Sequence, residues 1–269
     1  VPAGGMLAGA LVPGLSLWLG WQGTLAVVAG VCAVCAVLSQ PLRAALDADR
    51  QPSQALALGA LFRPVGMVLG HRSLAVLAAC SFLFSAVQVS VTAYMVTYLN
   101  GSLGMTLLAA GAALSVSQLA GVVGRIAWGA VADRGLGPRN TLMLLAVLMI
   151  VGSVLTALLQ PGWPTALIWA IVALLGASAI GWNGVYLATV ARQAPPGQAA
   201  TATGGTLMFT FMGVVLGSPA FGALAGFSGS YRLAFAALAL PAALALGLLL
   251  WRAMQVRREA ALQAPEAAQ

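Results

Sequence analysis

The sequence predicts an all-α, polytopic membrane protein with about eight transmembrane helices. Of its 269 residues, 61% are hydrophobic and 6% are charged, and the mean hydropathy is +0.98. Soluble domains carry about 25% charged residues, so this composition does not suit a water-covered surface. Apolar runs of roughly 18 or more residues, which are long enough to cross the hydrocarbon as helices, recur along the chain.

Eight such runs follow one another, at residues 2–18, 21–38, 73–99, 105–131, 141–159, 165–190, 201–227 and 233–251. Alternate connections between them are short and uncharged. The other connections and the segment after the last run carry ten arginines: Arg43, Arg50, Arg63, Arg72, Arg134, Arg139, Arg192, Arg252, Arg257 and Arg258. Arginine-rich connections stay in the cytoplasm. We therefore expect both ends of the chain in the cytoplasm, and the protein in the inner (plasma) membrane.

The polar segments divide the chain into four parts. Residues 1–39 hold the first two helices, residues 40–72 form a cytoplasmic linker, and residues 73–252 form a six-helix bundle. Within the linker, residues 55–70 are fairly apolar, but Arg63 and Pro64 interrupt them, which favours an interfacial helix over a ninth span. Residues 253–269 are polar, and we expect a frayed or disordered cytoplasmic tail.

Several other functional classes are disfavoured. The arginines stand singly at the ends of apolar runs and form no basic stripe for nucleic acid. Cys32, Cys35 and Cys80 lie in apolar runs without a histidine cluster, so we expect buried, inert thiols and neither a metal nor a cofactor. No catalytic triad or phosphate-binding loop indicates an enzyme. The chain begins at Val1 without a signal peptide, and we expect further helices upstream.

One connection carries a recognisable motif. Residues 129–139 contain Gly129, Asp133, Arg134, Gly137 and Arg139. This spacing resembles the cytoplasmic loop signature of the major facilitator superfamily, G-x-x-x-D-[RK]-x-G-x-[RK], with one extra residue before the second glycine. The resemblance implies that the eight helices match the family's fifth to twelfth, so the N-terminal bundle would be represented by its last two helices.

In that family the loop acts as a conformational latch, and the resemblance assigns this role to Gly129, Asp133, Arg134 and Arg139. We expect Gly129 to allow close helix approach and Asp133 to cap the helix junction. The two arginines would pair with Asp133 or with a neighbouring helix end. In the alternative interpretation, the loop collects arginines by the positive-inside rule and Asp133 only offsets them.

Ionisable groups inside a membrane are costly and are usually functional. The acids, Asp47, Asp49, Asp133, Glu259 and Glu266, all lie outside the central parts of the predicted spans, and His71 stands at a span's edge. Arg125 is the exception. Either its guanidinium reaches the cytoplasmic interface and braces the loop, or it faces a central cavity and binds an anion.

Polar residues at helical spacing extend the candidate substrate site. Ser115, Gln118 and Arg125 fall within about 80° on one helical face. Gln88, together with Thr92, and Asn183, together with Tyr186, form two further pairs. Each pair would either line the cavity or bond to neighbouring helices.

The sequence therefore predicts a transporter that moves a small solute across the lipid bilayer by alternating access. Arg125 favours an organic anion as the solute. Efflux of neutral or amphipathic compounds is the alternative, and a non-transporting membrane scaffold or receptor is the rival of another class. The expected partners are the solute, the bilayer and the upstream helices of the same protein.

Overall fold

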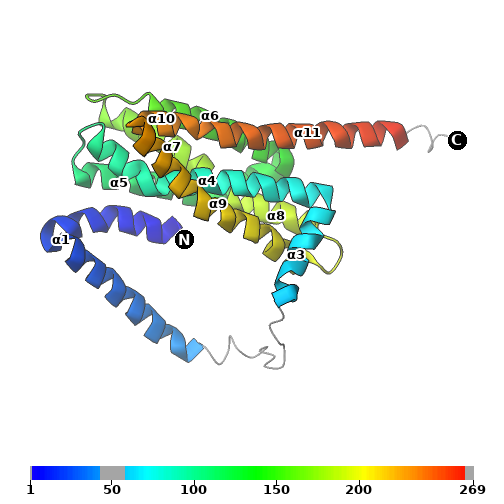
Figure 1. Cartoon of the computed structure of the whole chain (residues 1–269), viewed down its shortest axis with the longest axis horizontal. Coiled ribbons are helices and arrows are strands. Elements are labelled where there is room, and N and C mark those ends of the chain that lie inside the picture. Colours follow the sequence, from blue (N-terminus) through cyan, green and yellow to red (C-terminus); the bar gives the residue numbers. More distant parts are fainter. Residues whose placement is uncertain (1, 43–57, 264–269) are drawn as a thin grey trace.

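The computed structural model describes residues 2–42 and 58–263, and within them it contains helices and no strands (Figure 1). The longer helices are α1 (Pro2–Ser39), α4 (Arg72–Gly101), α5 (Leu107–Val131), α6 (Pro138–Ala157), α9 (Ala199–Ser228) and α11 (Ala239–Gln263). The shorter ones are α3 (Leu58–Gly70), α7 (Thr165–Ala179), α8 (Asn183–Gln193) and α10 (Tyr231–Ala237), with short turns η1 (Gln40–Leu42) and η2 (Ala132–Leu136).

Seven helical stretches of the described residues are long and apolar enough to cross a membrane. The predicted count of eight differs because residues 2–39 form one continuous helical stretch. Gly20, at φ 68° and ψ 174°, bends this stretch into two arms. The positive φ suits glycine, which lacks the Cβ that would clash there. The two arms match the first two predicted spans, and Figure 1 shows them as a V.

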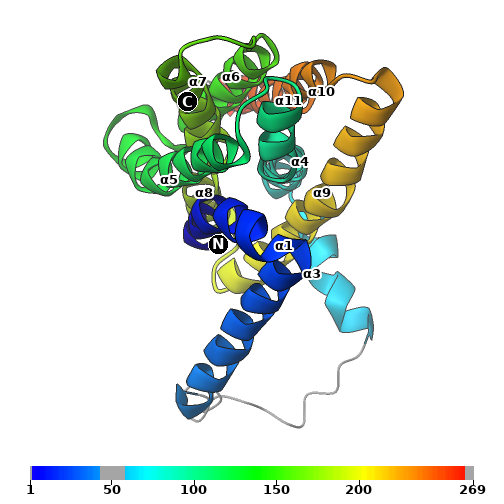
Figure 2. The ribbon, with the colours of Figure 1, turned by 90° about the vertical axis from the view of Figure 1, so that its left-hand side faces the viewer.

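The two arms of α1 have different surroundings. The first arm packs on α5, where Gly9 and Gly111 bring the two backbones together. The second arm lies away from the bundle in Figure 2, and Trp21 at its start is 68% exposed. Cys32 and Cys35 are therefore exposed, and the expectation that they are buried is wrong; Cys80 is buried.

Helix α4 lies in the centre of the bundle and packs against α9, α11 and α5 (Figure 2). Its contact with α9 is close because Gly213 and Gly217 of α9 face the α4 backbone. Ser85 donates a hydrogen bond to the Thr210 carbonyl at 2.7 Å, and Ser90 donates to the Gly217 carbonyl at 3.2 Å. Small residues and interhelical hydrogen bonds of this kind hold helices together within lipid.

Two predicted spans are interrupted. The chain turns at residues 180–182 between α7 and α8, and at Leu238 between α10 and α11. No proline lies within residues 165–193, so the first break is not a proline kink. It places free backbone carbonyls beside α5, which matters for the site below.

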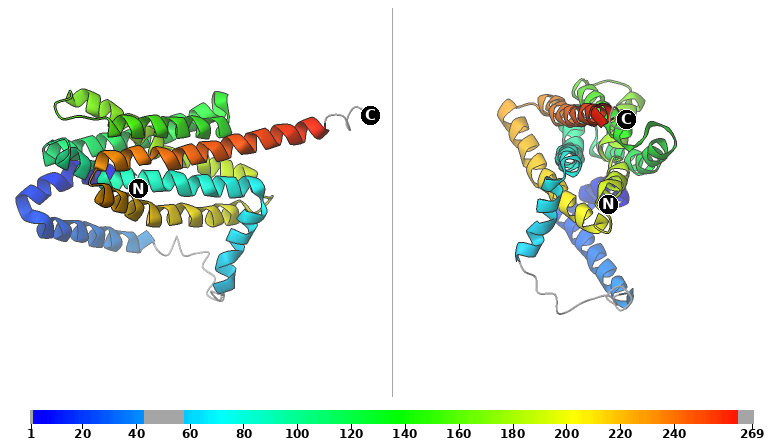
Figure 3. Two further views of the ribbon diagram at one scale, coloured as in Figure 1. Left: turned by 45° about the horizontal axis from the view of Figure 1, so that its top comes forward. Right: turned by 90° about the vertical axis from the view of Figure 1, so that its right-hand side faces the viewer.

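The tail and the linker depart from expectation in different ways. Helix α11 continues to Gln263 and extends beyond the other helices in Figure 3, so the frayed tail is wrong for residues 253–263. Arg252 donates to Glu259 at 3.2 Å, a bond that spans two turns of this extension.

In the linker, α3 is helical and packs on α9; its interfacial position stays a prediction. Asp47, Asp49 and Glu266 lie outside the described residues.

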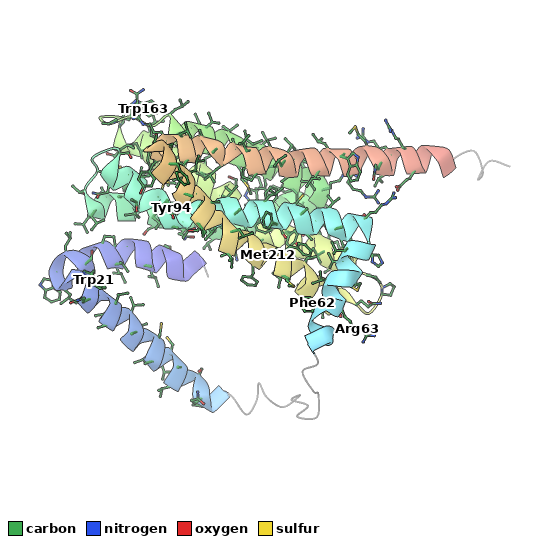
Figure 4. The ribbon with its side chains drawn as sticks, viewed as in Figure 1. Trp21, Phe62, Arg63, Tyr94, Trp163 and Met212 are labelled. Carbon is green, nitrogen blue, oxygen red and sulfur yellow. The ribbon has the colours of Figure 1, made fainter. Side chains whose placement is uncertain are left out.

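The two ends of the bundle differ in composition. Figure 4 shows Trp21 and Trp163 at one end and Arg63 at the other. At the arginine-bearing end, Arg192 contacts Asp133 and Arg252 contacts Ser73, so these separate connections lie together. Tryptophans are enriched at both interfaces of membrane proteins, and arginines are enriched in the cytoplasmic connections. Which end faces the cytoplasm stays a prediction.

Candidate functional site

A cavity of about 510 Å³ lies among α1, α4, α5, α8 and α9. This volume is within the range of about 300–1,000 Å³ that is typical of small-molecule sites. Its polar lining residues are Ser85, Gln88, Thr92, Gln118, Asn183 and Thr210, and Arg125 is the one charged residue among those that line it. Val89, Leu187, Leu207, Phe211 and Val214 form an apolar wall.

Four of the six predicted substrate residues meet here: Gln88, Gln118, Arg125 and Asn183. They come from α4, α5 and α8, which are far apart in the sequence. The helical spacing indicated that each is polar on one face of its helix, and the tertiary packing turns those faces toward a shared space.

Arg125 is held in place by the break between α7 and α8. Its Nε donates to the Ile180 carbonyl at 3.3 Å, and Trp128 donates through Nε1 to the Ala177 carbonyl at 2.9 Å. Close packing of Gly121 and Gly124 against this segment brings α5 near enough for both bonds. Interrupted helices supply free backbone groups at transporter binding sites. Among the described residues only the Nε of the half-buried Arg125 has a hydrogen-bond partner, so its two terminal nitrogens are available as donors there.

The orientation of Gln88 follows from its neighbours. Its Oε1 accepts from Trp182 Nε1 and from Asn183 Nδ2, each at 3.1 Å. An indole nitrogen only donates, so the Gln88 atom that faces it is the oxygen. The Nε2 group of Gln88 is then left as a donor beside the cavity. These bonds also tie the α7–α8 break to α4.

Ser115 and Tyr186 are not among the residues that line this cavity. Ser115 donates to the Met6 carbonyl at 2.9 Å, in the contact between α1 and α5. Tyr186 is 1% exposed, and its ring lies edge-on to Trp182 at a centroid distance of 5.1 Å. Both therefore make packing contacts, and their proposed role in substrate binding remains untested.

The motif loop differs in detail from its expected form. Residues 132–136 make a π-helical turn, and Gly137 follows at φ 75° before α6 begins. A π turn accommodates one additional residue in a helix, which agrees with the extra residue in the motif. Nothing lies within 4 Å of a Cβ built on Gly129, so the expectation that it allows close helix approach is wrong.

Asp133 pairs with a residue that the motif does not contain. Its Oδ1 accepts from Arg192 Nη2 of α8 at 2.8 Å, and it caps no helix. Among the described residues, neither Arg134 nor Arg139 forms an ion pair with Asp133. The expected pairing of these arginines with Asp133 is therefore wrong, and the expected cap by Asp133 is absent from this part of the structure; pairing with a neighbouring helix end, the other expectation, stays a prediction. Arg134 is exposed, whereas Arg139 lies between α4, α6, α8 and α11.

The residues of the candidate site and loop that the sequence did not indicate fall into two kinds. Arg192 looked like an ordinary positive-inside residue, and only the fold brings it to Asp133. The apolar wall gave no signal, because Leu187 and Phe211 are of the same residue types as side chains that face lipid. In the described residues, no group of three or more His, Cys, Asp or Glu could hold a metal ion.

These features define a polytopic helical membrane protein with an internal cavity beside a broken helix. The family model of the Major Facilitator Superfamily matches residues 1–210. The chain therefore belongs to the Major Facilitator Superfamily and is a membrane transporter. Comparison with curated proteins gives no significant match.

Proposed function

We propose that the protein carries a small organic anion, a carboxylate with an apolar body, through the cavity at Arg125 by alternating access. The observation that carries this proposal is the charge of the lining: Arg125 is cationic, and the other lining residues are neutral. No acidic side chain lies within 4 Å of Arg125 among the described residues.

A buried cation without a counterion is unfavourable, and an anionic ligand would compensate it. The guanidinium group matches a carboxylate by two parallel hydrogen bonds. Since Nε already bonds to Ile180, the terminal nitrogens are pre-oriented for this pairing. The donor Nε2 of Gln88 adds to the same preference for an acceptor-rich ligand.

The apolar wall constrains the rest of the ligand. Leu187, Leu207 and Phe211 suit an alkyl or aromatic portion better than a sugar or an inorganic ion. Efflux of a neutral amphipathic compound is the second candidate, and this same wall favours it. Such a compound would leave Arg125 without a partner, and the two candidates therefore differ in how they depend on that residue.

The position of the cavity supports alternating access. Gly5 of α1 and residues of α4, α5, α8 and α9 enclose it, which is the arrangement expected if residues 1–39 belong to one bundle and residues 73–252 to another. Asp133 and Arg192 connect the turn after α5 to the end of α8, the helix that follows the break. We assign the latch role to this pair, and we place the protein in the plasma membrane with the arginine-bearing end in the cytoplasm.

The test is uptake into proteoliposomes that contain the full-length protein. Butyrate and hexanoate are supplied as labelled substrates, and butyramide and hexanamide are added as competitors of matching shape. We expect the carboxylates to be transported and the amides to compete at least about tenfold less well, as loss of a charged hydrogen bond implies. Equal competition by the amides would favour the neutral amphipathic substrate.

A matched pair of variants isolates the cavity charge. Arg125→Gln removes it, and Arg258→Gln removes an exposed charge from α11. We expect carboxylate uptake to fall at least about tenfold in the first variant and to stay unchanged in the second, at equal protein content. Unchanged uptake by Arg125→Gln would contradict the proposal.

A further inference from the structure

A second, smaller cavity lies at the arginine-bearing end of the bundle. Its volume is about 70 Å³, and it is enclosed by α4, α6, α8 and α11. The polar residues that line it are Ser73, Arg139, Thr189, Gln193 and Arg252. Ser73 and Arg139 are each the second residue of their helix, and Gln193 is the last of α8. The cavity therefore lies where the spans leave the apolar part of the bundle.

The two arginines in this cavity differ in how many of their N–H donors have hydrogen-bond partners. The Nε of Arg139 is fully buried and has no hydrogen-bond partner among the described residues. Arg252 donates from Nε and Nη2 to Ser73 Oγ, at 3.2 and 3.1 Å, and from Nη1 to Glu259 at 3.2 Å. A buried donor without a partner costs about 1–3 kcal/mol, and more when it is charged.

The acids among the described residues do not fully neutralise this cluster. Among the described residues the acids are Asp133 and Glu259, and Asp133 already pairs with Arg192. Glu259 reaches Arg252 alone, and its side chain is 52% exposed. Two cationic groups therefore share a small space with one partly solvated carboxylate. An anion from outside the chain would relieve both the repulsion and the unsatisfied donor.

The amino-terminal end of helix α6 adds positive electrostatic potential at the same cavity. It begins at Pro138, next to Arg139, and no side chain caps its first turn. The amino-terminal end of a helix carries partial positive charge and free N–H groups, which favour anions. Three sources of positive potential, from α6 and α11, thus meet at one enclosed position.

We propose that this cavity binds a phosphate group, with Arg139 as its principal donor and with Arg252 and Ser73 completing the site. The volume exceeds the roughly 10–15 Å³ that one water needs, and it is far smaller than the cavity at Arg125. Donors that converge from three helices suit a tetrahedral oxyanion better than a planar carboxylate. The phosphate belongs either to a lipid headgroup at the interface or to a free ion, because basic pockets between helices bind phosphate-bearing headgroups and a free phosphate offers the same acceptor oxygens.

The wild-type protein provides the first test. The purified full-length protein is titrated with inorganic phosphate at constant ionic strength, with chloride as the reference, and thermal unfolding is followed. In parallel, it is placed in phosphatidylcholine nanodiscs with and without phosphatidylglycerol, and the lipid retained after exchange into neutral detergent is quantified by mass spectrometry. Saturable stabilisation by phosphate identifies a free ion, and retention of phosphatidylglycerol identifies a headgroup. If neither occurs, the proposal is wrong.

Two double variants localise the binding. Arg139→Gln with Arg252→Gln removes the charges of the cavity, whereas Arg257→Gln with Arg258→Gln removes two exposed charges from the same end. We expect at least about tenfold weaker binding in the first and wild-type binding in the second. Equal loss in both would show only general attraction to a basic surface and would overturn the site. If the first variant does not fold, Arg139→Lys, which keeps the charge and lacks Nε, replaces it and should bind more weakly.

Discussion

Arg125 and Arg192 carry the same charge in opposite surroundings. Arg125 is half buried in a largely apolar cavity and bonds to a backbone carbonyl. Arg192 pairs with Asp133, and the two side chains are 57% and 60% exposed. Charge interactions strengthen as water is excluded, so the same substitution should have unequal effects at the two positions. The sequence places Arg125 inside a predicted span and Arg192 just after one, and the proposed roles, substrate binding for Arg125 and a latch for Arg192, follow this difference in burial.

The largest effect is expected from adding a negative charge to the cavity that Arg125 lines. Gln88→Glu keeps an oxygen for Trp182 and Asn183 but places a carboxylate beside the cavity. At an effective dielectric of about 20, charges a few ångströms apart interact by roughly 4 kcal/mol, so we expect uptake of butyrate to fall by about a hundredfold or more. Thermal unfolding in detergent should change little. Unimpaired butyrate uptake would show that the anion does not pass Gln88.

The next effect concerns the packing of α5 on α7, which brings Arg125 close to the Ile180 carbonyl. A side chain added at Gly176 of α7 would meet the backbone of Ser117 in α5, whereas Gly129 has open space. We expect Gly176→Val to lower the free energy of unfolding by about 1–3 kcal/mol, as overpacking does, and Gly129→Val to cost far less. Urea unfolding of both purified variants measures the difference. Equal stabilities would contradict the described packing of α5 on α7.

A smaller effect is expected at the exposed ion pair. Asp133→Asn should lower stability by about 0–1 kcal/mol, because solvent screens the pair. If the pair acts as the proposed latch, the variant changes the uptake rate more than the stability. A double-mutant cycle with Arg192→Gln, followed by uptake, tests this assignment. Strictly additive effects on the rate would show that the two residues do not act together.

The smallest effect is expected at a cavity residue whose hydroxyl donates a hydrogen bond within its own helix. Thr92 lines the cavity but donates to the Gln88 carbonyl at 3.0 Å. Thr92→Val keeps the shape and removes a bond within one helix, so we expect less than about a twofold change in uptake. A large loss would mean that the Thr92 hydroxyl contacts the substrate.

The spans were predictable because crossing hydrocarbon demands long apolar helices, whereas the sidedness that the arginine pattern indicates stays a prediction. The break at residues 180–182 was not predictable, since no proline or long polar run marks it. Helical spacing indicated Gln88, Gln118, Arg125 and Asn183, because polar side chains are costly within a span, and the fold brings these four to one cavity; their role in substrate binding stays a prediction. Helical spacing could not separate these four from Ser115 and Tyr186, which do not line the cavity and make packing contacts with neighbouring residues. The helical extension of α11 was missed because its polar residues offered no apolar face.

Binding of hexanoate to the purified protein tests the central claim most directly. Isothermal titration with hexanoate and hexanamide is compared for wild type, Arg125→Gln and Arg258→Gln. The account predicts that wild type and Arg258→Gln bind hexanoate with the same affinity, and that Arg125→Gln and the amide each lose at least about tenfold. Equal affinity of wild type and Arg125→Gln for hexanoate would contradict it.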